Sequence, residues 1–146
     1  MKSPLLKVDL GMAVAVNLGP AWVLLDCGEG AWAAWQAREL PAQGPDAIAF
    51  SSGRPDRIAG LYGLLAGMAH AGRSAEVRLL HAVDDERVGN LASAWLQSER
   101  CPYPLTLEAD WPGATLVVGG ITLTSAADAG GLRWVLGGGA RKLEYP

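Results

Sequence analysis

Short apolar segments without polar alternation constrain the fold of this chain more than any other feature. Residues 13–16 are Ala-Val-Ala-Val, residues 23–25 are Val-Leu-Leu, and residues 47–50 are Ala-Ile-Ala-Phe. A strand with this pattern is usually buried on both of its faces. The sequence therefore predicts a layered fold, in which a central sheet is covered from two sides.

The order of the expected elements indicates an α/β fold. The chain has 146 residues, half of them hydrophobic, and we expect a single domain over residues 1–146. Gly119-Gly120 lies between two short apolar runs and predicts a tight hairpin. We expect strands over residues 10–16, 21–25, 47–50, 77–82, 105–108, 115–118, 121–124 and 132–136, and helices over residues 31–40, 58–71 and from Asp84 or Asp85 to about Glu99. This order is typical of α/β layers.

Charge and hydropathy exclude some classes of function. The formal net charge is −3, which argues against non-specific nucleic-acid binding, because that needs clustered positive charge. No uncharged run reaches the roughly 20 apolar residues of a membrane span, and no signal peptide is evident at the N-terminus. The two cysteines, Cys27 and Cys101, have no metal-ligand spacing, and we expect reduced thiols. We therefore expect a cytoplasmic protein without membrane contact.

Two segments carry a resemblance to a known family. Asp26-Cys27-Gly28-Glu29-Gly30 follows an apolar strand, and Asp46 with the second strand over 47–50 leads into a polar loop and then Gly60-Leu61. A weaker third match is Gly131-Leu132-Arg133. These segments resemble the metallo-β-lactamase superfamily, and within it the ribonuclease Z branch, in which Thr-His-x-His-x-Asp-His precedes Gly-Leu. The resemblance implies a metallo-β-lactamase-like αββα fold, of which this chain corresponds to the N-terminal half.

The chain departs from the family at the metal-binding loop. Ser51 takes the Thr position, Ser52, Arg54 and Arg57 take the three His positions, and only Asp56 is retained. A catalytic zinc needs about three protein ligands, and a guanidinium group has no lone pair to give. The only histidines in the chain, His70 and His81, are far from this loop in sequence. We therefore expect no cofactor and no metal, and we favour a protein without catalytic residues.

The loop residues have two interpretations. Ser51, Ser52, Arg54 and Arg57 could bind a phosphate or carboxylate through hydroxyl and guanidinium groups. Alternatively, Arg54 or Arg57 pairs with Asp56 and fills the space of the lost metals, and we favour this second interpretation. We interpret Asp56 itself as a helix cap rather than a remnant ligand. In the family, the residue that matches Asp26 supports the loop, so the resemblance gives Asp26 a structural role.

Three functional hypotheses follow from the sequence. The first is a non-catalytic interaction or scaffold module, that is, a pseudoenzyme. The second is a module that binds a small anion or an RNA end through the loop at residues 51–57. The third is a hydrolase or phosphodiesterase with metal-dependent or rewired chemistry. Because the chain corresponds to half of the fold, we expect one face of its sheet to lack cover. A homodimer, or a heterodimer with a complementary half-sandwich, would supply that cover.

Overall fold

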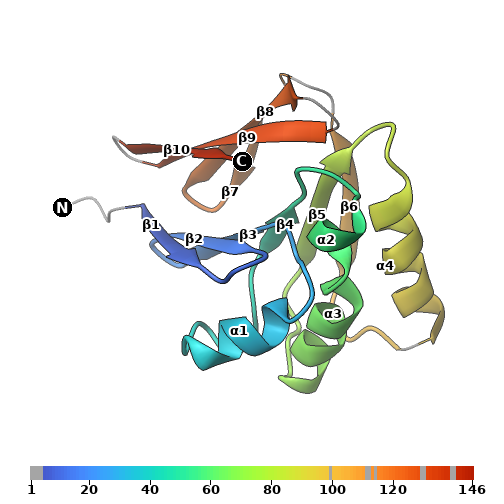
Figure 1. Cartoon of the computed structure of the whole chain (residues 1–146). Helices are drawn as coiled ribbons and strands as arrows, with labels where there is room; N and C mark the ends of the chain where they lie inside the picture. The colour runs from blue at the N-terminus through green and yellow to red at the C-terminus, as the bar shows by residue number, and fades with distance from the viewer. Residues whose placement is uncertain (1–4, 99, 111–112, 114, 129–130, 139–140) are drawn as a thin grey trace.

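The computed structural model describes residues 5–98, 100–110, 113, 115–128, 131–138 and 141–146, with only the backbone of Asp110. It contains two β-sheets and a layer of helices on one side of the larger sheet (Figure 1). The six strands of the larger sheet, called sheet A, are β1 (Leu6–Asp9), β2 (Val14–Leu18), β3 (Ala21–Leu25), β4 (Ala47–Ala49), β5 (Val77–Ala82) and β6 (Leu105–Asp110). The four strands of the second sheet, called sheet B, are β7 (Thr115–Val118), β8 (Ile121–Asp128), β9 (Gly131–Gly138) and β10 (Arg141–Tyr145). The helices are α1 (Ala31–Ala37), α2 (Pro55–Ile58), α3 (Leu61–His70) and α4 (Arg87–Ser98).

The two sheets have different strand directions. In sheet A, β1, β2 and β3 are antiparallel, whereas β3, β4, β5 and β6 run parallel and are joined by the helices. Sheet B is antiparallel throughout, and Val118 pairs with Ile121 across the predicted Gly119-Gly120 turn. Gly119 has φ of +57°, as this tight turn requires. The predicted α/β layers are confirmed.

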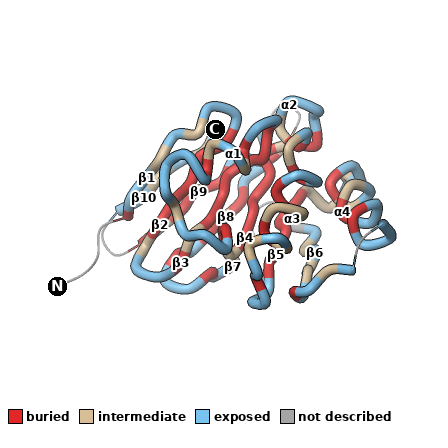
Figure 2. The backbone as a smooth tube through the Cα atoms, turned by 90° about the horizontal axis from the view of Figure 1, so that it is seen from below, coloured by how far each residue is buried: buried red, intermediate tan, exposed pale blue. Residues whose placement is uncertain are grey.

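Sheet A separates two hydrophobic cores, as its apolar strands predict. Alternate strand residues such as Ala15, Leu24 and Ile48 pack against the helices. Their neighbours, such as Val16 and Leu25, face sheet B. The central strands β2, β3, β4 and β5 are therefore buried along much of their length, which Figure 2 shows as continuous buried segments.

The expectation of an uncovered sheet face is wrong, because sheet B covers it. Ile121, Leu123, Trp134 and Leu136 are fully buried between the sheets. Most of their neighbours on the outer face of sheet B are polar or small, although Val117 is 58% exposed there and Val135 is half-buried. This outer set includes Thr122, Thr124, Ala126, Arg133, Lys142 and Glu144. Such alternation is typical of an antiparallel sheet with one solvated face, so this face does not demand a further layer.

The expected helix over residues 58–71 is in fact two helices. Helix α2 ends at Ile58, and α3 begins at Leu61 after Gly60. The N–H of Gly60 donates to the carbonyl oxygen of Cys27 at 2.9 Å, so the chain leaves the helical path to bind the end of β3. A Cβ atom at Gly60 would overlap the carbonyl oxygen of Gly28, and glycine permits this approach.

Two further sequence expectations concern helix ends. Asp85 accepts the backbone N–H of Arg87 at 3.1 Å and so caps the start of α4, as expected. Glu99, the expected last residue of that helix, lies outside the described residues.

Within the described ranges, no helix is long and apolar enough to cross a membrane.

Candidate functional site

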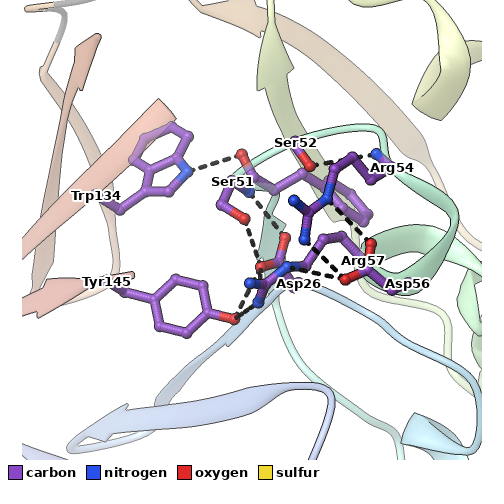
Figure 3. Close-up of polar contacts among 9 residues, drawn as sticks. Asp26, Ser51, Ser52, Arg54, Asp56, Arg57, Trp134 and Tyr145 are labelled. Atoms are coloured by element: carbon purple, nitrogen blue, oxygen red, sulfur yellow. Dashed lines mark hydrogen bonds and ion pairs between the residues drawn. The ribbon is translucent and has the colours of Figure 1, made fainter. Parts of the chain in front are cut away.

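The loop at residues 51–57 lies where parallel strands of sheet A end. It leaves the carboxyl end of β4, beside Asp26, which follows the carboxyl end of β3. Ligands of open α/β sheets commonly bind at this edge. Figure 3 shows Ser51 and Arg57 pointing toward Asp26 and Tyr145, and Arg54 pointing toward Asp56.

Asp26 is the buried centre of the site. Its Oδ1 accepts the N–H of Ser51 at 2.8 Å, and its Oδ2 accepts the hydroxyl of Ser51 at 2.6 Å. Asp26 has φ of +59°, a conformation that Asp tolerates better than most residues. Burial raises the pKa of Asp26, and the hydrogen bonds from Ser51 and Tyr145 and the charge of Arg57 oppose that rise. Asp26 thus fixes the start of the loop, as expected of a structural residue.

Arg57 and Tyr145 join the loop to sheet B. The Tyr145 hydroxyl donates to Asp26 Oδ2 at 2.8 Å and accepts from Arg57 Nη1 at 3.0 Å. Arg57 Nη1 also lies 3.3 Å from Asp26 Oδ2. Tyr145 is 119 residues from Asp26 in sequence and belongs to no recognised motif, so sequence reasoning missed it.

Two hydrogen bonds to backbone carbonyl oxygens fix the same junction. The N–H of Leu132 donates to the carbonyl oxygen of Ser51 at 2.7 Å, and Trp134 Nε1 donates to that of Phe50 at 2.9 Å. A Cβ at Gly131 would overlap the Ser51 carbonyl oxygen, which gives a physical reason for the glycine of the Gly-Leu-Arg segment. The first and third family-like segments therefore meet at the loop.

Arg54 and Asp56 form an exposed ion pair. Arg54 Nε and Nη2 donate to the two carboxylate oxygens of Asp56 at 3.2 and 2.8 Å, and Arg57 Nε lies 3.8 Å from Asp56 Oδ2. These contacts hold the pKa of Asp56 below its usual value. The interpretation of Asp56 as a helix cap is wrong, because α2 starts at Pro55 and has no side-chain cap. The expected Arg–Asp56 pairing is present.

Asp85 supports the loop from the α4 side. Its carboxylate accepts the N–H of Gly53 at 2.9 Å and the side chain of Arg87 at 2.8 and 3.0 Å. These bonds lower the pKa of Asp85 to about 2, with the Arg87 side chain as the largest cause. Sequence analysis identified Asp85 as a possible cap but not its contact with the loop.

A pocket lies between the loop and sheet B. It has a volume of about 110 Å³. Ser51, Ser52, Arg54 and Arg57 line one wall, and Asp128, Gly131 and Leu132 line the other. The four residues predicted as an anion site are therefore brought together around one space.

The residues of the loop do not fit a catalytic metal. Of the four degenerate positions, only Asp56 carries a carboxylate, and two guanidinium groups lie against it. His70 lies in the last turn of α3, and the His81 Nδ1 is 2.9 Å from the carbonyl oxygen of Ala82. In the part of the chain that the structure describes, no three or more His, Cys, Asp or Glu side chains are placed to hold a metal. The positive charges of Arg54 and Arg57 at the ligand positions would repel a metal cation.

Comparison with solved structures identifies the fold. A metallo-β-lactamase fold protein, YhfI from Bacillus subtilis, superposes with a TM-score of 0.70 over 91% of this chain at 17% identity. A Cronobacter sakazakii metallo-β-lactamase with a HARLDQ motif gives 0.63 over 91% at 18% identity. The short form of human tRNase Z gives 0.68 over 90% at 16% identity. The chain therefore has the metallo-β-lactamase fold, as its sequence predicted.

The match covers only part of these relatives. The chain spans 52% of YhfI, 51% of the Cronobacter protein and 60% of human tRNase Z, so it corresponds to about half of the fold. The presence of tRNase Z among the matches agrees with the ribonuclease Z-like sequence segments. No protein-family model matches the chain, and no curated protein sequence matches it.

Proposed function

We propose that this protein is a metal-free, ribonuclease Z-like relative of the metallo-β-lactamases that binds a ligand or partner and does not hydrolyse it. One observation carries the proposal. The retained carboxylate of the family loop, Asp56, is held by Arg54 at 2.8 Å, and both guanidinium groups occupy positions that carry histidine in the family. The loop is thus a self-compensated ion-pair cluster in place of a metal site.

Among the described residues of the site, we find no activated nucleophile for metal-independent hydrolysis. Ser51 is buried, and its hydroxyl proton is donated to Asp26 at 2.6 Å. Asp26 in turn accepts from Tyr145 and lies against Arg57, so its oxygens serve the fold. A general base must reach the proton of its reacting group in a plausible substrate pose. Because Asp26 is buried, a structural role suits it better than the role of a general base.

A second candidate, a rewired or metal-dependent hydrolase, has one observation in its favour. The Cronobacter metallo-β-lactamase has the motif His-Ala-Arg-Leu-Asp-Gln. Residues 52–57 of this chain are Ser-Gly-Arg-Pro-Asp-Arg, with Arg and Asp at the same third and fifth places. An arginine at Arg54 therefore does not by itself argue against hydrolysis. The two sequences differ at the other four places, among them the first, where this chain has Ser52, and the last, where it has Arg57.

A hydrolysis assay separates the two candidates. The purified protein is incubated with a phosphodiester and a β-lactam substrate, with and without added Zn²⁺ or Mn²⁺, beside an active zinc hydrolase. We expect no turnover above the buffer. Turnover that survives repurification, is lost in Asp56→Ala and persists in the exposed control Asp84→Ala would support the hydrolase.

A further inference from the structure

We infer that the pocket between the loop and sheet B is a site for a single phosphate group. Asp56 forms ion pairs with Arg54 and Arg57 until a phosphate group displaces its carboxylate. The inference rests on the proposed function, because it takes the loop to bind and not to hydrolyse.

The pocket is large enough for one phosphate group but too small to enclose a larger molecule that carries it. Its volume of about 110 Å³ lies well below the roughly 300–1,000 Å³ of pockets that enclose drug-sized molecules. The rest of a larger ligand would stay outside. Arg54 and Arg57 come from the loop, and Leu132 and Asp128 come from sheet B, so the pocket combines two cationic side chains with a wall that carries one apolar and one acidic side chain.

Donor groups for an oxyanion are present on the loop wall. Among the described residues, Arg54 bonds Asp56 through Nε and Nη2, and the hydrogen bonds of Arg57 to Asp26 and Tyr145 use Nη1. A guanidinium group has five N–H donors, so each side chain keeps donors for a ligand. The Ser52 Oγ accepts the N–H of Arg54 at 3.2 Å, which leaves its hydroxyl proton to donate. Arginine forks match the spacing of phosphate oxygens.

The charges at the pocket predict competition. Arg54 and Arg57 face Asp56, and Asp128 on the other wall lies 3.9 Å from Arg133. The cluster is therefore nearly neutral while Asp56 is in place. The Asp56 side chain is 44% exposed, so it can turn into solvent and release the guanidinium groups. Removing its charge should strengthen phosphate binding, whereas removing Arg54 should weaken it.

The test uses two variants with opposite expected effects on phosphate binding and a third variant as a control. Arg54→Ala removes a side chain that is 57% exposed and bonds only to Asp56 among the described side chains, so the fold should persist. Asp56→Asn keeps the shape of the side chain without its charge. Arg38→Ala removes an exposed positive charge at the end of α1 and is the control for net charge. Arg57 is left intact because it also contacts Asp26 and Tyr145.

Binding is measured by calorimetry at low salt with three probes. The probes are inorganic phosphate, a short oligonucleotide with a 5′-phosphate, and the same oligonucleotide without it. We expect Arg54→Ala to weaken binding of the phosphorylated probes about tenfold, which is the effect of losing one charge-assisted contact. We expect Asp56→Asn to tighten it severalfold and Arg38→Ala to leave it unchanged. Higher salt should reduce the differences, because the charges are exposed.

The probes also distinguish the source of the phosphate. Tighter binding of the phosphorylated oligonucleotide than of inorganic phosphate supports a nucleic-acid end as the ligand, and equal binding supports free phosphate. No binding by wild type or by Asp56→Asn, or equal affinities of wild type, Arg54→Ala and Asp56→Asn, would overturn the phosphate site. Turnover of a phosphodiester in the hydrolysis assay would instead contradict the proposed function.

Discussion

Asp26 shows how one buried carboxylate can organise a loop without a metal. It accepts hydrogen bonds from the backbone and hydroxyl of Ser51 and from Tyr145, and it lies 3.3 Å from Arg57. A buried charge is costly unless it is paired and hydrogen-bonded. These donors come from both sheets, so the network holds together only in the folded chain.

Tyr145→Phe should destabilise the protein without changing its fold. The substitution removes the bond to Asp26 and the bond from Arg57, and it leaves two buried or half-buried groups with a missing partner. Such losses cost about 1–3 kcal/mol. Urea unfolding measures the change in the free energy of unfolding. Tyr62→Phe, which removes the hydroxyl of a tyrosine that is 37% exposed, is the matched control and should stay within about 0.5 kcal/mol of wild type. Equal stability of Tyr145→Phe and wild type would show that the network does not hold the sheets together.

The lowered pKa of Asp85 predicts that the protein loses stability in acid. Its pKa is about 2 in the folded chain, below the value of about 3.9 in an unfolded one. A group with a lowered folded pKa stabilises the protein above its unfolded pKa, and this contribution is lost as the pH falls from about 4 toward 2. Asp85→Asn should therefore lower Tm at pH 7 and flatten its fall over that interval. Melting curves of Asp85→Asn, wild type and Asp84→Asn at several pH values check this. A Tm profile of Asp85→Asn that parallels wild type throughout would contradict the role given to Asp85.

Several elements were predictable because local patterns determine them. The apolar strands, the Gly119-Gly120 hairpin and the Asp85 cap all depend on neighbouring residues. The break between α2 and α3 was not predictable, because it depends on the contact of Gly60 with Cys27 and Gly28. The same holds for the site. The loop residues carry a motif, whereas Tyr145 reaches Asp26 only through the packing of the two sheets.

Alanine substitution at Gly60 and at Gly63 should change the free energy of unfolding in opposite directions. Gly60→Ala should destabilise the protein by about 2 kcal/mol or more, because the new methyl group would overlap the backbone of Gly28. Gly63 lies exposed within α3 and has open space around it. Gly63→Ala should therefore stabilise the protein by roughly 0.5–1 kcal/mol. Thermal and urea unfolding of both variants test the pair. Similar effects of the two substitutions would show that the α2–α3 break does not need glycine.

The whole molecule covers its own central sheet. Helices pack on one face of sheet A, and sheet B packs on the other (Figure 1). The predicted homodimer or heterodimer thus loses the argument on which it depended, and it stays a prediction. Light scattering across a wide concentration range tests it, and a monomer throughout would exclude the homodimer. Independently, we expect no binding of a dye that reports exposed apolar surface, and strong dye binding would contradict the packing of the two sheets.

Zinc titration of the purified protein tests the central claim most directly. The wild type is stripped with chelator, titrated with Zn²⁺ by calorimetry and analysed for metal content. The variant Ser52→His with Arg54→His, which adds two histidines beside Asp56, is treated in parallel as a positive control. We predict well under one zinc per chain in the wild type and a clear gain of zinc binding in the variant. One or more zinc ions held tightly by the wild type, and lost in Asp56→Ala, would contradict the account.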